Sequence, residues 1–353
     1  MSFERQVIFW VAAMAILVFC LWALGDILLP FVVGMALAYL FNPVANVLQR
    51  FGMPRIVAAL LIIGLFALAF VMLVLVFAPL IGSQLVSFIQ NVPGYVQRLQ
   101  SLLAESNSPW LRRIGAEALV EDKAIGDLVS QGMGWLNTFI QSLWSGGRTL
   151  ISIFSLAVVT PVVAFYLICD WDRMFTTIDG WVPLPQRATV RQLGHEIDQA
   201  IAGFVRGQTT VCLLLGSFYA VSLSLAGLNF GLLIGLVSGV ITFIPYVGSM
   251  TGLVLSLGVA FAQFWPDWSP ILIVFGIFMV GQFIEGNILA PKLVGDNVGL
   301  HPVWVIFAMF AFGYLFGFVG LLLAVPLAAA VRVIAEFSLR RYRDSPLYTG
   351  DGT

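Results

Sequence analysis

Charged residues divide the chain into long uncharged stretches that are rich in apolar side chains. Arg5 and Asp26 are separated by 20 uncharged positions, and about 20 apolar residues are enough for a helix to cross the hydrocarbon core of a bilayer. Similar stretches recur toward the end of the chain. The pattern predicts an all-α, polytopic transmembrane helical bundle of about eight spans, at about residues 6–25, 27–49, 56–79, 150–169, 208–226, 230–262, 269–289 and 303–334.

The longest uncharged stretch holds 60 positions between Arg206 and Asp267. Because this is far more than one spanning helix needs, the chain must turn within it. The strongest turn signal is Gly227-Leu228-Asn229. Residues 208–226 are therefore predicted to form the fifth span, and residues 230–262 a sixth span that is broken part of the way along.

Two stretches carry regular charges and are not expected to cross lipid. Between Ser83 and Arg148, and again between Asp170 and Arg206, apolar residues recur at helical spacing, a pattern typical of amphipathic helices. Pro93-Gly94 is expected to interrupt the first stretch. The predicted organisation is spans one to three in 1–82, an amphipathic extramembrane segment in 83–148, span four in 149–169, a second amphipathic segment in 170–206, spans five to eight in 207–335 and a tail in 336–353.

Composition supports a membrane location. Hydrophobic residues make up 60% of the chain and charged residues only 10%, whereas soluble domains carry about 25% charged residues. The formal net charge of -1 provides no basic field for nucleic acid. All three cysteines, Cys20, Cys169 and Cys212, lie in apolar runs, which indicates neither a disulfide framework nor a metal site.

Arginines indicate the orientation. Arg50 and Arg55 lie in one short loop, and four more arginines lie between Arg332 and Arg343. Because Lys and Arg accumulate on the cytoplasmic side of membrane proteins, both termini are predicted to be cytoplasmic. Residues 83–148 would then face the periplasm.

Four glycines recur every four residues at Gly227, Gly231, Gly235 and Gly239. This spacing predicts a smooth helix face along which another backbone approaches closely. Static packing is the more common meaning of such a face, and a sliding contact is the alternative.

Pro245 lies near the middle of the longest uncharged stretch, between Phe243 and Gly248. A proline has no N–H for the carbonyl of Ile241 and so leaves that carbonyl in need of a partner. Broken backbone at membrane depth is tolerated where it is buried in protein or lines a wet cavity. Pro245, Tyr246 and Gly248 are therefore candidate pathway residues, with an ordinary proline kink as the alternative.

Glu285 lies near the end of the seventh predicted span and shares a helix face with Gln282. A carboxylate at mid-bilayer costs about 2.5–3.5 kcal/mol, so it normally faces the protein interior or water. It could bind a cation or a proton, or accept hydrogen bonds from a polar solute. The alternative is that Glu285 anchors the span at the membrane interface. Pro291 frees the carbonyl of Asn287 in the same region.

Two further polar residues are weaker candidates. His301 precedes Pro302 at the predicted start of the eighth span, where it would either titrate near neutral pH or cap the helix. Gln208 is a single polar residue at the start of the fifth span. The chain has no phosphate-binding glycine loop, no His-Glu-x-x-His and no Gly-x-Ser-x-Gly. We therefore expect no enzyme activity, no cofactor and no metal, and transport driven by gradients.

Five motifs in matching order resemble the autoinducer-2 exporter family of bacterial permeases between about residues 20 and 335. They are Gly34 to Pro43, Gly203 to Gln208, Gly235 to Gly248, Gln282 to Pro302 and Gly317 to Ala329. The resemblance implies a multi-pass inner-membrane transporter that forms homo-oligomers, with a pentameric ring as one candidate form. It also implies candidate pathway residues at Gln208, Pro245, Tyr246, Gly248, Glu285, Asn287, Pro291 and His301, and Gln282 joins them because it shares a helix face with Glu285.

Three functions remain open at this stage. The first is a gradient-driven or facilitative exporter of a small polar metabolite such as the quorum-sensing signal autoinducer-2. The second is a sodium/proton antiporter that uses the same carboxylate. The third is a membrane scaffold that recruits a partner through residues 83–148.

Overall fold

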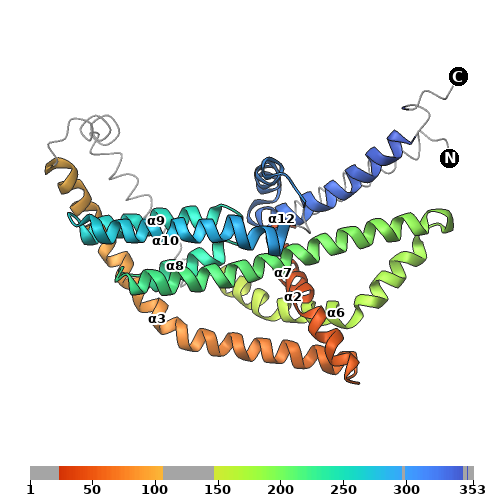
Figure 1. The fold of residues 1–353 in the computed structure, drawn as a ribbon. Helices are drawn as coiled ribbons and strands as arrows, with labels where there is room; N and C mark the ends of the chain where they lie inside the picture. Colours follow the sequence, from red (N-terminus) through yellow and green to blue (C-terminus); the bar gives the residue numbers. More distant parts are fainter. Residues whose placement is uncertain (1–23, 106–146, 296–298, 345–347, 349–353) are drawn as a thin grey trace. The chain divides into compact units, whose positions relative to one another are not determined.

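The computed structural model describes residues 24–105, 147–295, 299–344 and 348 (Figure 1). The predicted first span and Cys20 lie outside these residues, apart from the last two positions of that span. The described chain is helical and contains no strand. Its α-helices are α2 (Gly25–Arg50), α3 (Arg55–Glu105), α6 (Gly147–Trp181), α7 (Arg187–Leu225), α8 (Gly231–Ile241), α9 (Val247–Phe264), α10 (Trp268–Ile284) and α12 (Pro302–Arg343).

Six helical segments among the described residues are long and apolar enough to cross a membrane. The prediction of an all-α, polytopic transmembrane bundle is therefore confirmed. The segments are Ile27–Arg50, Arg55–Phe77, Leu184–Leu225, Val247–Phe264, Trp268–Gly295 and Pro302–Arg343.

The chain folds into two compact units. The first unit comprises Met1–Ala67, Ser155–Thr210 and Ile288–Thr353, and the second comprises Leu68–Phe154 and Val211–Asn287. Of the predicted pathway residues, Gln208, Pro291 and His301 belong to the first unit, and the remaining six belong to the second.

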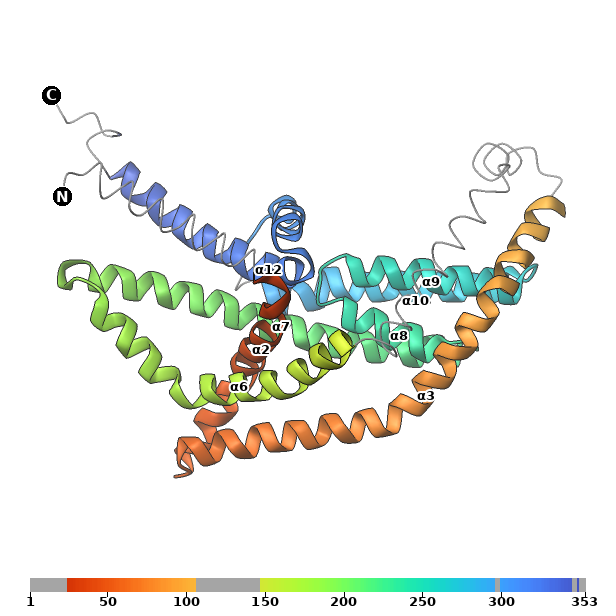
Figure 2. The same ribbon diagram turned by 180° about the vertical axis from the view of Figure 1, so that it is seen from behind.

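In the first unit, α2 packs against α6 and the start of α3 around a core of small residues (Figure 2). Ala38, Ala45, Ala59 and Ala164 are fully buried there. A methyl group on Gly34 of α2 would lie 2.8 Å from a side-chain carbon of Val163 on α6. Small side chains therefore set the close spacing of these helices.

Arg55, at the start of α3, links this helix to α2 and α6 through hydrogen bonds. Its guanidinium donates to the carbonyl oxygen of Ile168 on α6 at 2.7 Å, and to the side-chain oxygens of Asn42, Asn46 and Gln49 on α2. The guanidinium therefore donates hydrogen bonds to neutral oxygens of two neighbouring helices, an arrangement that satisfies its planar fork of donors. Asn42 lies within the first family-like motif, so at least part of that motif has a structural role.

In the second unit, α9 lies beside both α8 and α10 (Figure 1). The C-terminal part of α7, from Val211 onward, belongs to the same unit. Its face that carries Gly216, Ala220 and Leu223 packs against α8.

Several helices are longer than predicted. α3 continues through Pro93-Gly94 to Glu105, so the expected interruption there is wrong. One proline removes a single backbone hydrogen bond, which a long helix of strong helix formers tolerates. α6 and α7 likewise run without a break across the predicted boundaries at 169/170 and 206/207. The predicted boundaries mark where the chain leaves the bilayer, which a continuous helix does not test, so they stay predictions.

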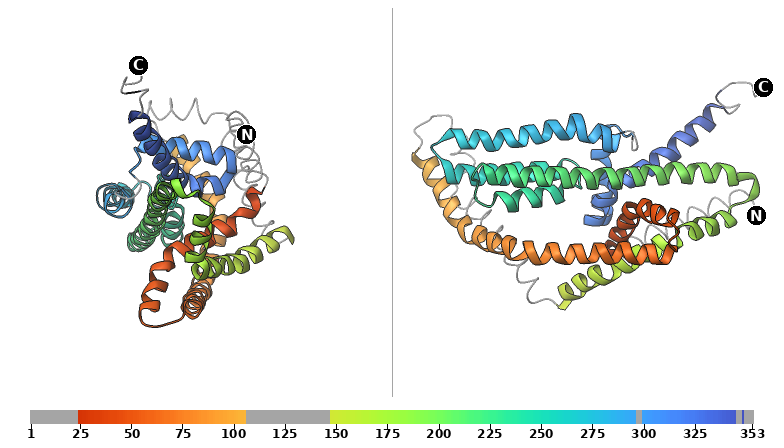
Figure 3. Two further views of the ribbon diagram at one scale, coloured as in Figure 1. Left: turned by 90° about the vertical axis from the view of Figure 1, so that its right-hand side faces the viewer. Right: turned by 60° about the horizontal axis from the view of Figure 1, so that its bottom comes forward.

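α12 is interrupted, but not at its internal proline. Pro326 is buried inside a regular part of the helix. The backbone leaves helical geometry at Gly317, where φ is 59° and ψ is -138°, and the helix changes direction there (Figure 3). The chain folds back so tightly that a methyl group on Gly320 would collide with the carbonyl oxygen of Phe312.

Candidate functional site

The break between α8 and α9 is a compact turn over residues 242–246 that contains Pro245. The carbonyl of Ile241, which the sequence left in need of a partner, accepts a hydrogen bond of 2.9 Å from the N–H of Ile244. Tyr246 follows with φ of 67° and a side chain that is 48% exposed. Gly248 is buried against Thr242, where a methyl group would meet the Thr242 backbone. The turn is therefore closed by its own backbone and requires a glycine at position 248.

Three of the four regularly spaced glycines form a close contact between helices. Gly231, Gly235 and Gly239 of α8 face the backbone of α7 at Leu223, Ala220 and Gly216, respectively. A methyl group on any of the three would lie within 3 Å of backbone atoms of α7. Gly227 has a different role, because it lies in the turn between α7 and α8 with φ of 72° and no neighbour at the place of a side chain.

Gln282 and Glu285 are joined at the C-terminal end of α10. The Gln282 side-chain amide donates a hydrogen bond of 2.8 Å to a carboxylate oxygen of Glu285, and both residues are half-buried. Asn287 is exposed, and its side chain donates to the carbonyl oxygen of Phe283 at 3.0 Å. The spacing of three residues on one helix therefore produces the polar pair that the sequence suggested.

A π-helix starts at Glu285 and continues to Gly295. In an α-helix the carbonyl of Asn287 would pair with the N–H of residue 291, which proline lacks. In a π-helix each carbonyl pairs instead with the N–H five residues later, so the partner of Asn287 is Lys292. π-helical segments are rare and occur frequently at functional sites. Glu285 thus lies where the helical register changes.

Glu285 lies in a stretch of sequence with few charged residues. The second unit contains no Lys or Arg between Val211 and Asn287, and Asp267 is the other acidic residue of that stretch. Asp267 caps the start of α10, where its carboxylate accepts a hydrogen bond of 3.0 Å from the N–H of Ser269. Glu285 is therefore hydrogen-bonded to a neutral amide, with no cationic residue in the same stretch of sequence.

Tyr219 is a buried polar residue of the second unit that the sequence analysis did not identify. Tyr219 belongs to α7, and its side chain is fully buried. Its ring stacks on that of Phe278, with the ring centroids 4.5 Å apart. The hydroxyl has no hydrogen-bond partner. In the sequence it is one aromatic residue in an apolar run, so no spacing or charge singled it out.

Three candidate residues, Gln208, Pro291 and His301, belong to the first unit. Gln208 is 5% exposed, and its neighbour Gly207 packs against the carbonyl of Leu293 in the π-helix. Pro291 is exposed in the same π-helix. His301 caps α12, because its ring nitrogen Nδ1 accepts a hydrogen bond of 3.3 Å from the N–H of Val303.

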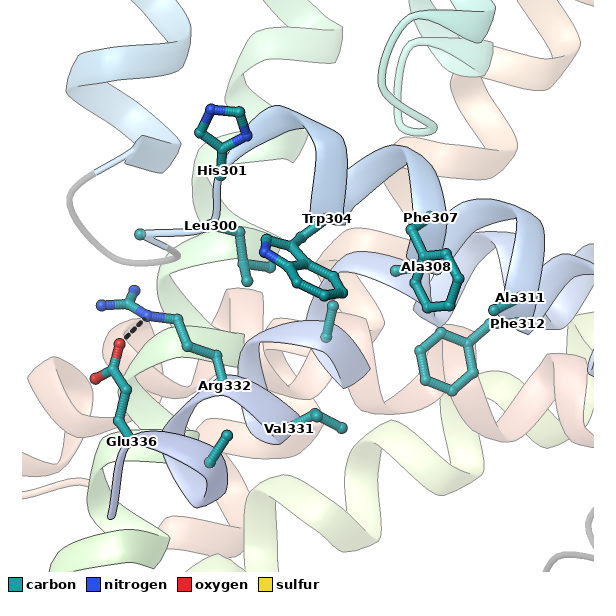
Figure 4. Close-up of a pocket in the computed structure, with 13 residues that line it drawn as sticks. Leu300, His301, Trp304, Phe307, Ala308, Ala311, Phe312, Val331, Arg332 and Glu336 are labelled. Carbon is teal, nitrogen blue, oxygen red and sulfur yellow. Dashed lines mark hydrogen bonds and ion pairs between the residues drawn. The ribbon is translucent and has the colours of Figure 1, made fainter. Parts of the chain in front are cut away.

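A cavity of about 520 Å³ lies between the two arms of α12 (Figure 4). Its walls are mostly aromatic and aliphatic, and Arg332 and Glu336 form an ion pair of 2.6 Å at one end. The sequence analysis missed it, because it exists only where the helix folds back at Gly317. The apolar part of its lining includes Trp304, Phe307, Ala308, Ala311, Phe312 and Val331.

Charged residues cluster where the end of α6 meets the start of α7. Arg191 donates two hydrogen bonds of 2.6 Å to the carboxylate of Asp179, and Arg187 lies 3.6 Å from it. These hydrogen bonds, chiefly those from Arg191, lower the pKa of Asp179 below its ordinary value of 3.8. The ion pairs fasten the end of α6 to the start of α7.

Long apolar helices and interrupted spans define a polytopic membrane protein. The chain belongs to the AI-2E transporter family, which it matches over residues 11–340. The family membership identifies a permease and not an enzyme, with a small solute and the lipid bilayer as its partners.

Known relatives agree with this class. The "Putative transport protein YrrI" of Bacillus subtilis (strain 168) is 30% identical over 317 residues, which cover 89% of this chain and 87% of the relative. The "Putative permease PerM" of Escherichia coli (strain K12) is 26% identical, with 88% and 87% covered. The "AI-2 transport protein TqsA" of the same strain is 22% identical, with 88% and 86% covered.

Proposed function

We propose that the protein is a secondary transporter that exports a small polar metabolite such as autoinducer-2, with Gln282 and Glu285 in the solute pathway. The observation that carries the proposal is the hydrogen-bonded pair of these two side chains, half-buried where α10 becomes a π-helix. A carboxylate in a membrane span is costly, and it is normally retained because it binds a solute, an ion or a proton.

The chemistry of the pair suits a solute with hydroxyl groups. The carboxylate of Glu285 offers lone pairs to hydroxyl donors, and the amide of Gln282 both donates and accepts. The name of TqsA, which assigns AI-2 transport to that relative, supports a solute of this class. Gln208, Pro245, Tyr246, Gly248, Asn287, Pro291 and His301 complete the proposed pathway.

The remaining parts of the proposal concern energy and location. Transport uses a gradient, since the sequence holds no nucleotide-binding glycine loop. The protein resides in the bacterial inner membrane with both termini in the cytoplasm, as the arginine distribution favours. It assembles as a homo-oligomer, for which the pentamer is the candidate form.

A sodium/proton antiporter is the second candidate function. It is favoured by the absence of Lys and Arg between Val211 and Asn287. A carboxylate without a counter-charge in an apolar environment is stable when it carries a proton or holds a cation, and alternation between these two forms is the cycle of an antiporter. The scaffold alternative concerns residues 83–148, most of which lie outside the described part of the chain.

The test is autoinducer-2 efflux from preloaded proteoliposomes that contain wild-type protein, Glu285→Gln or Asp267→Asn. Both variants neutralise an acid of α10, and Asn keeps the capping interaction of position 267. We expect Glu285→Gln to lower the efflux rate about tenfold or more, which corresponds to about 1.4 kcal/mol, and Asp267→Asn to retain the wild-type rate.

The outcomes separate the candidate functions. Wild-type efflux from Glu285→Gln removes this residue from the mechanism and contradicts the proposal. A sodium gradient that changes the internal pH of wild-type vesicles, without any autoinducer-2 efflux, identifies the antiporter instead. Vesicles that show neither activity contradict both.

A further inference from the structure

The fully buried hydroxyl of Tyr219 lacks a hydrogen-bond partner in an otherwise well-packed region. Buried polar side-chain atoms nearly always have a partner, so each exception requires an explanation. A phenylalanine at this position would give the same ring stacking on Phe278 without burying an unpaired hydroxyl. Packing alone therefore does not account for a tyrosine.

The position of the hydroxyl relates it to the polar pair of α10. A methyl group on Gly281 would collide with the ring and hydroxyl of Tyr219, so the phenol lies directly against the α10 backbone at this residue. Gln282 is the next residue, and the N–H groups of its side-chain amide lie close to the phenol oxygen, so the proton of the hydroxyl is the part that lacks an acceptor. The hydroxyl of Tyr219, the amide of Gln282 and the carboxylate of Glu285 thus lie along one short length of α10.

The three groups offer complementary chemistry. The Gln282 amide already donates to Glu285, and the ionised carboxylate only accepts. The hydroxyl of Tyr219 is the group with an uncommitted proton. A ligand that binds these groups must accept a hydrogen bond from the hydroxyl of Tyr219 and donate one to the carboxylate of Glu285.

We infer that Tyr219 is a solute-binding residue, whose hydroxyl donates to a carbonyl or ether oxygen of a neutral polyhydroxy solute held by Gln282 and Glu285. The inference rests on the proposed function and adds to it a residue and a solute class. A neutral solute fits because Glu285 repels anions, whereas a solute without an oxygen acceptor leaves the phenol unpaired. Binding would supply the hydrogen-bond partner that the hydroxyl lacks in the solute-free protein.

The variant Tyr219→Phe tests this inference, because it removes one oxygen atom and keeps the ring. Tyr166→Phe is the matched control, since Tyr166 lies on α6 with a side chain that is 60% exposed. For each protein, the concentration dependence of autoinducer-2 efflux from proteoliposomes gives KM and the maximal rate. Thermal unfolding in detergent gives the midpoint temperature of the same preparations.

We expect Tyr219→Phe to unfold at the wild-type temperature or above, because the variant no longer buries an unpaired hydroxyl. Its KM for autoinducer-2 should rise about tenfold, while the control keeps the wild-type KM. A purely structural hydroxyl would leave KM unchanged.

Two results overturn the inference alone. One is an unchanged KM in Tyr219→Phe beside active wild-type protein. The other is a lowered unfolding temperature, which would show that the hydroxyl is paired within the protein, with Gln282 as the nearest partner. Wild-type vesicles that move no autoinducer-2 instead overturn the proposed function, and the inference with it.

Discussion

Both units of the protein pack small residues closely, but they differ in the use of charged side chains to link helices. In the first unit, polar and charged side chains link one helix to another: Arg206 donates to the carbonyl oxygen of Tyr39 at 3.0 Å, and the Tyr39 hydroxyl donates to Asp198 at 3.0 Å. In the second unit, α8 meets α7 through Gly231, Gly235 and Gly239.

The hydroxyls of the second unit illustrate the difference. The buried side chains of Ser238, Thr242 and Ser256 each donate to a carbonyl oxygen of their own helix, four residues earlier. The hydroxyls of Ser238 and Ser256 are therefore satisfied within their own helices, and close packing of backbones joins α8 to α7. The carboxylate of Glu285 and the hydroxyl of Tyr219 are the groups of this unit for which we propose a role in solute binding.

The largest expected effect concerns the glycine contact. Gly235→Ala should destabilise the protein by about 3 kcal/mol, because the added methyl group meets the backbone of Ala220, which cannot move aside as a flexible side chain could. The matched control is Gly276→Ala on α10, where no atom lies within 4 Å of the added methyl group. Titration of the purified protein with a denaturing detergent measures the difference, and equal stability of the two variants would contradict close backbone packing.

A smaller effect is expected in the first unit. Arg55→Met should lower the free energy of unfolding by about 2 kcal/mol, because it removes hydrogen bonds from a charged donor to oxygens on α2 and α6. Arg50→Met removes the same charge from the exposed end of α2 and should cost less than about 0.5 kcal/mol. The same detergent titration applies. If both variants lose equal stability, net charge and not the hydrogen-bond cluster explains the effect.

The smallest effect concerns the exposed ion pair between α6 and α7. Since Arg191 lowers the pKa of Asp179 below 3.8, the pair stabilises the fold above this pH and loses its contribution as the pH falls through the lowered value. We expect the unfolding temperature of the wild type to lose this small contribution below about pH 4, and Asp179→Asn to lack that part of the pH dependence. Superimposable pH profiles of the two proteins would show that the pair contributes nothing in solution, as is common for exposed pairs.

Glycines and prolines were not equally informative in the sequence. Pro245 correctly indicated the break between α8 and α9, yet Pro30, Pro43, Pro161 and Pro326 lie inside regular helices. The break in α12 occurs instead at Gly317, whose backbone conformation side chains other than glycine rarely adopt. Nothing in the sequence distinguishes this glycine from Gly313 or Gly320, because the choice depends on how the two arms of the helix pack.

The sequence by itself determined the membrane class of this protein, most of its spans and the pairing of Gln282 with Glu285. These properties follow from hydrophobicity and from spacing along one helix, and both can be read locally. Only the tertiary structure decided that Gly231, Gly235 and Gly239 pack against the backbone of α7. It also decided that Tyr219 is buried beside Gly281, because burial and pairing depend on which residues from distant parts of the chain come together.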